Sequence, residues 1–175
     1  RPGNVGKLLD IGGGPGSYAQ AFLDAAPGMT ATIFDLPPVI NIARRRLEAA
    51  GLLGRVNLVA GDFYKDELPA GHDLALLSAI IHQNSPEQNM ELYRKIFRAL
   101  LPGGRLVIRD NIMNADHTHP LSGALFAVNM LVVTEGGGTY SFDEIRSSLE
   151  SAGFIKVNLI QPDEQMNGLV EGFKP

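Results

Sequence analysis

Four glycines within five residues carry the most evident chemistry in this sequence. The apolar run Leu8-Leu9-Asp10-Ile11 leads directly into Gly12-Gly13-Gly14-Pro15-Gly16, and a helix is expected from Ser17 or Tyr18. Glycine has no side chain to hold a ligand away from the backbone, and the start of the following helix offers unpaired N–H groups to a ligand's negative end. The pattern therefore predicts a strand, loop and helix that bind a nucleotide-like ligand.

The loop alone leaves two kinds of ligand open. The stretch Gly14-Pro15-Gly16-Ser17-Tyr18-Ala19 also satisfies the Gly-x-Gly-x-x-Gly/Ala pattern of dinucleotide-binding folds. Asp35 ends the second expected strand, where its carboxylate can accept hydrogen bonds from both hydroxyls of a ribose. Because a ribose occurs in either kind of ligand, Asp35 does not distinguish between them.

A carboxylate and an aromatic ring close the third expected strand, in Gly61-Asp62-Phe63. Asp62 can accept a hydrogen bond from the exocyclic amine of adenine while Phe63 packs on the base. The later stretch Ala99-Leu100-Leu101-Pro102-Gly103-Gly104-Arg105-Leu106-Val107-Ile108 is typical of a helix, a Pro-Gly-Gly turn and a strand. These motifs favour a ligand that contains adenine.

Short apolar runs alternate with amphipathic stretches along the whole chain, which predicts an α/β fold around a mostly parallel sheet. One helix is expected to begin after Ser85, which can cap it, with Pro86 in its first turn, and to end before Pro102. The last two strands are joined by only about residues 161–168, too few for a helical crossover, so they should be antiparallel. The expected strands are Lys7–Ile11, Thr30–Asp35, Val56–Ala60, Leu74–Ser78, Arg105–Arg109, Ile155–Ile160 and Leu169–Phe173.

Composition limits the classes of protein. The 175 residues, of which 45% are hydrophobic, suit one domain, and the absence of cysteine excludes thiol catalysis and disulfides. A net charge of −4 without a basic block disfavours a nucleic-acid partner. No apolar run approaches a membrane span and no signal-peptide pattern occurs, so we expect a cytoplasmic protein. The chain lacks an initiator Met and enters a buried strand within a few residues, which suggests that an upstream part is missing.

Taken together, the glycine loop, the Gly61-Asp62-Phe63 end and the Pro-Gly-Gly turn resemble the class I, Rossmann-like methyltransferases, and from Leu8 to Lys174 the chain resembles the plant-type O-methyltransferase family and its bacterial relatives. The resemblance implies a seven-stranded, mostly parallel sheet with a reversed last strand and helices on both faces. Residues 1–175 would be the catalytic domain that binds S-adenosyl-L-methionine. A helical N-terminal domain, missing from this chain, would form the homodimer.

In the family, S-adenosyl-L-methionine lies across the carboxyl ends of the strands. The residues that we assign to the cofactor on this resemblance are Asp10, Gly12, Gly14, Gly16, Asp35, Leu36, Asp62, Phe63 and Ser78.

The resemblance also implies a catalytic base. His82 follows the fourth strand, where the family has a histidine that deprotonates the acceptor hydroxyl, and imidazole is the side chain that ordinarily titrates near neutrality. Asp110 ends the fifth strand, where the family has an acidic residue that orients the base. Gln83 and Asn84 depart from the Asp and Trp that commonly follow the family's histidine.

A second supporting acid of the family is replaced by Thr139. Asp110 alone is therefore the expected support of His82, and Glu135 is an alternative to Thr139 as the replacement of the second acid.

A metal-dependent mechanism is an alternative, because catechol-type methyltransferases hold magnesium with an Asp-Asn pair such as Asp110-Asn111. Their further carboxylate would fall near Ser78, which lacks the charge that a hard divalent cation prefers, so we expect no metal ion. The cluster Asp116-His117-Thr118-His119 is more typical of a solvated loop. Ser78-Ala79-Ile80-Ile81 stands where amine-methylating nucleic-acid enzymes have an Asn/Asp-Pro-Pro-Tyr-like motif.

The apolar stretch Leu121–Val133 predicts a helix, and in the family this region walls the acceptor pocket. We assign acceptor contacts to Phe126, Asn129 and Met130. The expected function is methyl transfer to a hydroxyl of an aromatic or polyketide-like small molecule. Methyl transfer to nitrogen or carbon, and a non-catalytic or NAD-binding Rossmann module, remain alternatives.

Overall fold

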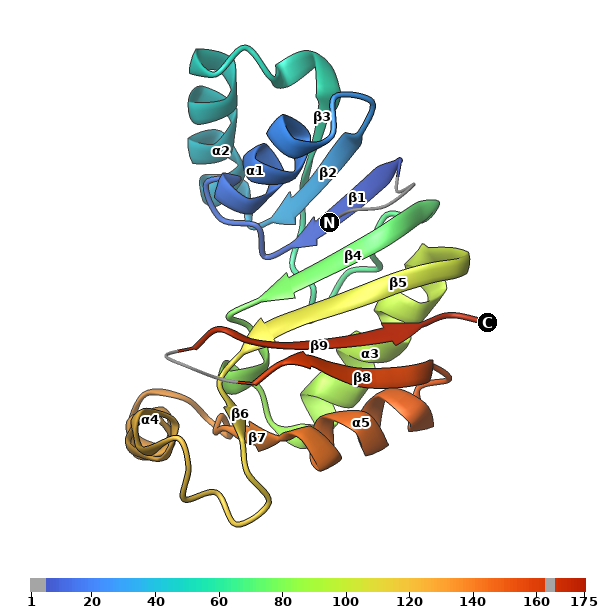
Figure 1. Ribbon diagram of the computed structural model, residues 1–175. Helices are drawn as coiled ribbons and strands as arrows, with labels where there is room; N and C mark the ends of the chain where they lie inside the picture. The colour runs from blue at the N-terminus through green and yellow to red at the C-terminus, as the bar shows by residue number, and fades with distance from the viewer. Residues whose placement is uncertain (1–5, 163–165) are drawn as a thin grey trace.

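Seven strands form one sheet in the computed structural model, which describes residues 6–162 and 166–175 (Figure 1). The strands are β1 (Lys7–Ile11), β2 (Thr30–Asp35), β3 (Val56–Ala60), β4 (His72–Ser78), β5 (Leu100–Asp110), β8 (Ile155–Gln161) and β9 (Gly168–Phe173). They lie in the order β3-β2-β1-β4-β5-β9-β8, and β9 runs antiparallel to both of its neighbours while the pairs from β3 to β5 are parallel. The predicted fold class, with its reversed last strand, is confirmed.

Helices cover both faces of this sheet (Figure 1). The α-helices are α1 (Ser17–Ala25), α2 (Pro37–Ala49), α3 (Pro86–Ala99), α4 (Leu121–Val133) and α5 (Phe142–Ser151). The short elements are the 3-10 turns η1 (Leu53–Arg55) and η2 (Ile81–Gln83) and the parallel pair β6 (Ile112–Met113) and β7 (Tyr140–Ser141). None of the helices in the described ranges is long and apolar enough to cross a membrane.

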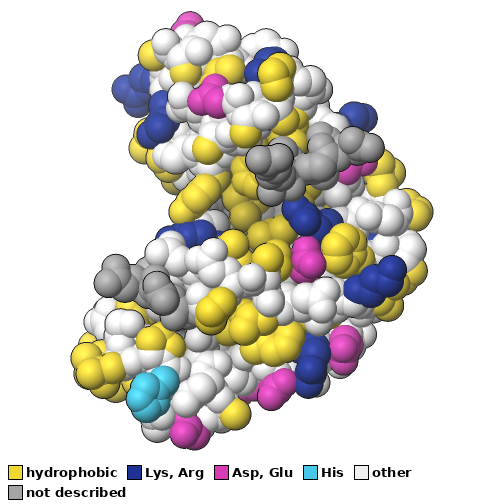
Figure 2. Space-filling view, in the orientation of Figure 1, with side chains coloured by type: hydrophobic (Ala, Val, Ile, Leu, Met, Phe, Trp, Pro, Cys, Tyr) yellow, Lys and Arg dark blue, Asp and Glu magenta, His cyan; other side chains and the backbone are white. Residues whose placement is uncertain are grey.

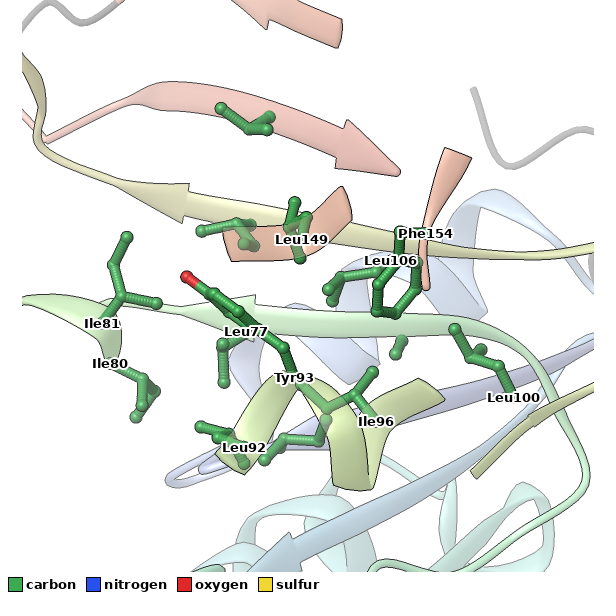
Figure 3. Packing of buried hydrophobic residues seen from close by; sticks show 14 of the residues in the cluster. Leu77, Ile80, Ile81, Leu92, Tyr93, Ile96, Leu100, Leu106, Leu149 and Phe154 are labelled. Atoms are coloured by element: carbon green, nitrogen blue, oxygen red, sulfur yellow. The ribbon is translucent and has the colours of Figure 1, made fainter. Parts of the chain in front are cut away.

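Alternation along the strands divides the core into two layers, because successive side chains of a strand point to opposite faces. Leu77 and Leu106 point toward α3 and α5, and Figure 3 shows them packed with Tyr93 and Ile96 of α3. Leu76, one residue away from Leu77, points to the face that α1 and α2 cover. The inner strands β1 and β2 are therefore buried on both faces, as is typical of parallel sheets.

The face under α1 and α2 is covered over β1, β2 and β3 but less so over β4, β5 and β9. A groove of about 460 Å³ lies there, with Phe22, Leu76, Val107 and Leu169 among its lining residues. Figure 2 shows a hollow with a hydrophobic floor between the part that contains α1 and the part that contains β9. Arg109 adds a positive charge to the groove.

Three strands begin earlier than their apolar runs indicate, and two of them, β4 and β9, do so by only one or two residues, at His72 and Gly168. β5 begins at Leu100 instead of Arg105 because Leu100 pairs with His72 of β4. Pro102, Gly103 and Gly104, expected as a turn before this strand, instead lie inside β5 at an irregularity in its pairing with β4. Gly103 N–H donates there to Lys174 O at 3.0 Å. Helix α3 begins and ends as expected, and Ser85 forms a capping box with Gln88 at its start.

Candidate active site

The carboxyl ends of the parallel strands meet at one edge of the sheet and form a cavity of about 360 Å³. Five residues assigned to the cofactor from the sequence line it, together with four others. The lining residues are Gly12, Asp35, Leu36, Gly61, Asp62, Phe63, Tyr64, Ile80 and Gln83. Side chains from the ends of three strands and from the turn after β4 are therefore brought together, as the sequence predicts.

The glycine loop needs glycine for its backbone at three positions, since φ is 63° at Gly12, 56° at Gly14 and 79° at Gly16. A Cβ atom on Gly14 would have no atom within 4 Å, so the loop is open on that side. A Cβ atom on Gly16 would lie 2.9 Å from the side chain of Ile33 in the core. The space beside Gly14 is thus open, whereas Gly16 lets the start of α1 pack closely on β2.

Asp35 joins the end of β2 to the glycine loop. Its Oδ2 accepts a hydrogen bond from Gly14 N–H at 2.8 Å, and its Oδ1 accepts one from Leu36 N–H at 2.7 Å. A carboxylate offers about four acceptor positions, so two donors leave capacity for the hydroxyls of a ligand in the cavity.

Asp62 lines the cavity from the end of the neighbouring strand β3, in a tight turn. Its Oδ2 pairs with Lys65 Nζ at 3.0 Å, and its Oδ1 accepts from Tyr64 N–H at 3.0 Å. The hydrogen bond from Lys65, followed by that from Tyr64, holds the pKa of Asp62 below its ordinary value. The turn is fixed from below by the buried Lys95 of α3, whose ammonium donates to three carbonyl oxygens, among them Phe63 O at 2.9 Å.

His82 and Asp110 meet beside this cavity, although they are 28 residues apart in sequence. His82 Nδ1 lies 2.8 Å from Oδ1 and 3.1 Å from Oδ2 of Asp110, which is fully buried at the end of β5. A carboxylate oxygen accepts hydrogen bonds, so we assign the imidazole proton to Nδ1, which makes Nε2 the basic nitrogen. The His82 side chain is 14% exposed, and the ring of Phe126 packs edge-on against it at 4.9 Å between centroids.

Several of the other assigned residues lie outside the cavity. Asp10, Gly14, Gly16 and Ser78 do not line the cavity, and Ser78 Oγ instead lies 3.5 Å from the Arg109 guanidinium. Of the three acceptor residues, Phe126 packs its ring against His82, Asn129 is exposed and Met130 is buried.

The remaining candidates give no second partner to His82 among the hydrogen bonds of the described residues. Thr139 is buried with its hydroxyl unpaired there, and Glu135 is exposed. His117 pairs with Glu144 at 3.1 Å, and Asp116 accepts from Thr118. Across residues 6–162 and 166–175, no group of three or more His, Cys, Asp or Glu side chains is placed to hold a metal ion.

A family model described as an O-methyltransferase domain matches residues 3–155 of the chain. The chain belongs to this O-methyltransferase family. The 3-hydroxy-5-methyl-1-naphthoate 3-O-methyltransferase of Streptomyces sahachiroi is 36% identical over 171 residues, which cover 97% of this chain and 49% of that protein. The L-tyrosine C(3)-methyltransferase of Streptomyces lavendulae is 35% identical over 149 residues, covering 85% of this chain and 41% of that protein.

Solved structures agree with this assignment. The structure of PigF with SAH matches this O-methyltransferase domain with a TM-score of 0.89 at 34% identity, and the match covers 97% of this chain and 51% of the PigF chain. The curated PigF is an S-adenosyl-L-methionine-dependent methyl transferase of a Serratia species. The chain spans about half the length, or less, of the curated relatives that it matches.

Sequence reasoning missed several residues that shape the site of this family member. Lys95 lies on the buried face of α3 together with Leu92, Ile96 and Ala99. A charged residue on an apolar helix face indicates a buried side chain with hydrogen-bond partners, so the sequence did carry a signal for it. Gly137 packs against the turn of His82 so closely that a Cβ atom there would lie 2.4 Å from His82 O. Asn84, which follows η2, is fully buried.

Asp10 supports the glycine loop from beneath. Its side chain is 1% exposed, and a Cβ atom on Gly13 would lie 2.8 Å from its carboxyl carbon. Burial, opposed in part by a hydrogen bond from the Ala19 backbone, raises the pKa of Asp10 from 3.8 to about 7. Asp10 therefore keeps its proton in the folded protein at pH values where it has lost it in the unfolded chain.

This difference predicts a pH dependence of stability. Between about pH 4 and pH 7 the folded state binds one proton more at Asp10 than the unfolded state, so its contribution falls as the pH rises through that window, by on the order of 4 kcal/mol. We expect Asp10→Asn to remove most of this decline in denaturant unfolding at a series of pH values. Asp24→Asn, on the exposed surface of α1, should retain it. A decline of the same size in Asp10→Asn would contradict the raised pKa.

Proposed function

We propose that this chain is the catalytic domain of a methyltransferase that binds S-adenosyl-L-methionine and methylates a hydroxyl of an aromatic or polyketide-like small molecule. The observation that carries the proposal is the His82–Asp110 pair beside the 360 Å³ cavity. Ile80 and Gln83, on either side of His82 in the chain, both line that cavity. The turn that carries the proposed base therefore forms part of the wall of this nucleotide-sized cavity.

The cavity suits the adenosine part of the cofactor. Asp35 would accept from the ribose hydroxyls, Asp62 from the exocyclic amine of adenine, and Phe63 would pack on the base, while Gly14 keeps the loop open. When bound, S-adenosyl-L-methionine supplies a methyl group on a positively charged sulfur. The name of PigF and its structure with SAH support the same cofactor for this chain.

His82 would act as the general base. Its Nε2 accepts the proton of the acceptor hydroxyl, and the oxygen thereby gains the electron density that it needs to take the methyl group. Asp110 holds the imidazole through Nδ1 and stabilises the imidazolium that forms. Phe126 packs against the ring and limits its rotation, which keeps Nε2 directed at one position.

Methyl transfer to carbon is a second candidate. The observation that favours it is the 35% identity to an L-tyrosine C(3)-methyltransferase. Removal of a phenolic proton also activates the neighbouring ring carbon, so the same base serves either acceptor atom. Analysis of the product by NMR distinguishes the two reactions.

We also propose that a preceding helical domain of a longer protein covers α4 and forms the homodimer contact. Helix α4 has no charged residue, and six of its apolar side chains are between 60% and 81% exposed, namely Leu121, Leu125, Val128, Leu131, Val132 and Val133. So large an apolar surface is typical of an interface. The absence of cysteine agrees with a reducing compartment, and we propose a cytoplasmic location.

The cofactor proposal predicts the effect of Asp35→Ala. Calorimetry should show that the wild-type chain binds S-adenosyl-L-methionine and S-adenosylhomocysteine and that Asp35→Ala weakens both by about 10- to 100-fold, because charged hydrogen bonds are lost. Asp24→Ala, outside the cavity, should bind as the wild type does. A preference for NAD in the wild type would favour the dinucleotide-binding alternative instead.

The catalytic proposal predicts the effect of His82→Ala. Turnover with a phenolic acceptor at pH 7 should fall by about 10² to 10⁴-fold, with cofactor affinity nearly unchanged. Raising the pH should restore part of the rate, because a phenol ionises near pH 10 and solvent then supplies phenolate. His119→Ala, in an exposed loop, should leave turnover as it is. Near-normal turnover of His82→Ala at pH 7 would assign His82 a structural role.

The interface proposal predicts protection of α4 in the longer protein. Hydrogen–deuterium exchange at residues 121–133 should be slower there than in the 175-residue chain, while exchange in α2 stays the same. Light scattering of the longer protein should give twice the protomer mass. Equal exchange of α4 in both proteins would show that nothing covers it.

A further inference from the structure

Two buried amides lie directly behind the turn that carries His82. Asn84 is 0% exposed and Asn89 is 3% exposed. Asn84 Nδ2 donates to Asn89 Oδ1 at 3.0 Å, and Asn89 Nδ2 donates to Ile81 O at 3.0 Å. A buried amide without hydrogen-bond partners destabilises the folded state, so the two side chains are held in this one arrangement.

The backbone carbonyl of Ile81 fixes which group donates and which accepts in each of these hydrogen bonds. A backbone carbonyl can only accept, so Asn89 must present its NH₂ group to Ile81 O and its oxygen to Asn84. Asn84 must then present its NH₂ group to Asn89 and its own oxygen to the other side. There the hydroxyl of Tyr64 donates to Asn84 Oδ1 at 2.5 Å. Tyr64, Asn84 and Asn89 thus form one relay of donors that ends at the residue before His82.

The relay holds a turn that is weak in itself. The turn η2 is a single 3-10 turn, and its own hydrogen bonds are Gln83 N–H to Ile80 O at 3.1 Å and Asn84 N–H to Ile81 O at 3.3 Å. The Tyr140 hydroxyl adds a hydrogen bond to Asn84 O. The conformation of η2, and with it the direction of the His82 imidazole, therefore depends on contacts from outside the turn.

The other end of the relay lies in the cofactor cavity, because Tyr64 is one of its lining residues. Tyr64 is 48% exposed, and its ring packs against Phe63 at 4.6 Å between centroids. A single network therefore connects the wall of the cavity to the turn of the base.

We infer that Asn84 is a positioning residue for His82, and that with Tyr64 and Asn89 it couples the cofactor cavity to the orientation of the base. The inference rests on the proposed role of His82. It gives a physical reason for the departure at position 84, because an Asn there serves the relay where the family commonly has Trp. Tyr64 would then influence the rate of the reaction through the hydroxyl that it donates to Asn84.

Tyr64→Phe tests the coupling with the smallest change, since it removes one hydroxyl from a half-exposed ring. We expect kcat with a phenolic acceptor to fall about tenfold, the value of one hydrogen bond, while KM for S-adenosyl-L-methionine changes by less than about threefold. In a His82→Ala background, measured at raised pH, the same substitution should have no further effect, because the relay acts through His82.

Asn84→Asp is the second variant, since it keeps the size of the side chain and, measured at raised pH where the carboxyl is ionised, cannot donate to Asn89 Oδ1. It should lower kcat more than Tyr64→Phe does. Asn41→Asp, the same substitution on the exposed surface of α2, should keep the wild-type kcat. An equal loss in both His82 backgrounds, or a raised KM with unchanged kcat, would overturn the inference.

A second measurement needs no acceptor. In protein labelled at histidine with ¹⁵N, the Nδ1–H signal of His82 is identified by its loss in His82→Ala. It should exchange faster with solvent in Tyr64→Phe than in the wild type and in Asn41→Asp. An unchanged exchange rate overturns the coupling even if no acceptor is methylated, whereas an inactive wild type that shows the expected exchange contradicts the proposed function alone.

Discussion

The carboxyl group of Asp110 is fully buried at the end of β5, and a buried carboxylate is stable only where donors reach it. Asn111 N–H supplies one donor at 2.8 Å and His82 Nδ1 supplies the other. For His82 to reach Asp110, the chain must turn sharply after β4. It does so at Ala79, a non-glycine residue with a φ of 57°, whose N–H donates to Arg109 O at 2.8 Å. The edge of the sheet, the strained turn and the buried acid thus depend on one another.

The same turn forms one wall of the 360 Å³ cavity, so the cavity and the His82–Asp110 pair are not independent of each other. The cavity side is rigid, because Asp35 ties the glycine loop to β2 and Lys95 ties the Asp62 turn to α3. His82, by contrast, lies in a single 3-10 turn between β4 and α3. The hydrogen bonds of Tyr64, Asn84 and Asn89 behind that turn stabilise it in addition to its own two hydrogen bonds.

Much of the fold could be predicted from the sequence, because it is recorded in local patterns. The bounds of β1, β2, β3 and α4 follow from apolar runs and their flanking residues, and they match the structure. The expected starts of β4 and β5 were wrong because His72 and Leu100 gain strand geometry only by pairing with each other. The meeting of His82 with Asp110 could be expected only from the family resemblance, because no local pattern joins residues 28 positions apart.

The relay escaped prediction for a related reason. Asn84 meets Tyr64 across 20 residues, and a polar residue next to a turn ordinarily indicates a solvated loop. Asn84 was visible in the sequence only as a departure from the family pattern, without the partners that give it a role.

Helix α4 is the element beside the candidate site whose side chains are mostly exposed. It contacts the rest of the domain along a narrow stripe that includes Gly123, Phe126 and Met130, which are spaced as one helical face, and Asn129 falls outside that stripe. One aromatic ring on this stripe reaches the base, whereas the cofactor cavity is built from the ends of three strands and the turn after a fourth. Under the proposed function, a change in α4 would therefore alter the choice of acceptor without disturbing cofactor binding. Such a division suits a family in which one relative is named for transfer to oxygen and another for transfer to carbon.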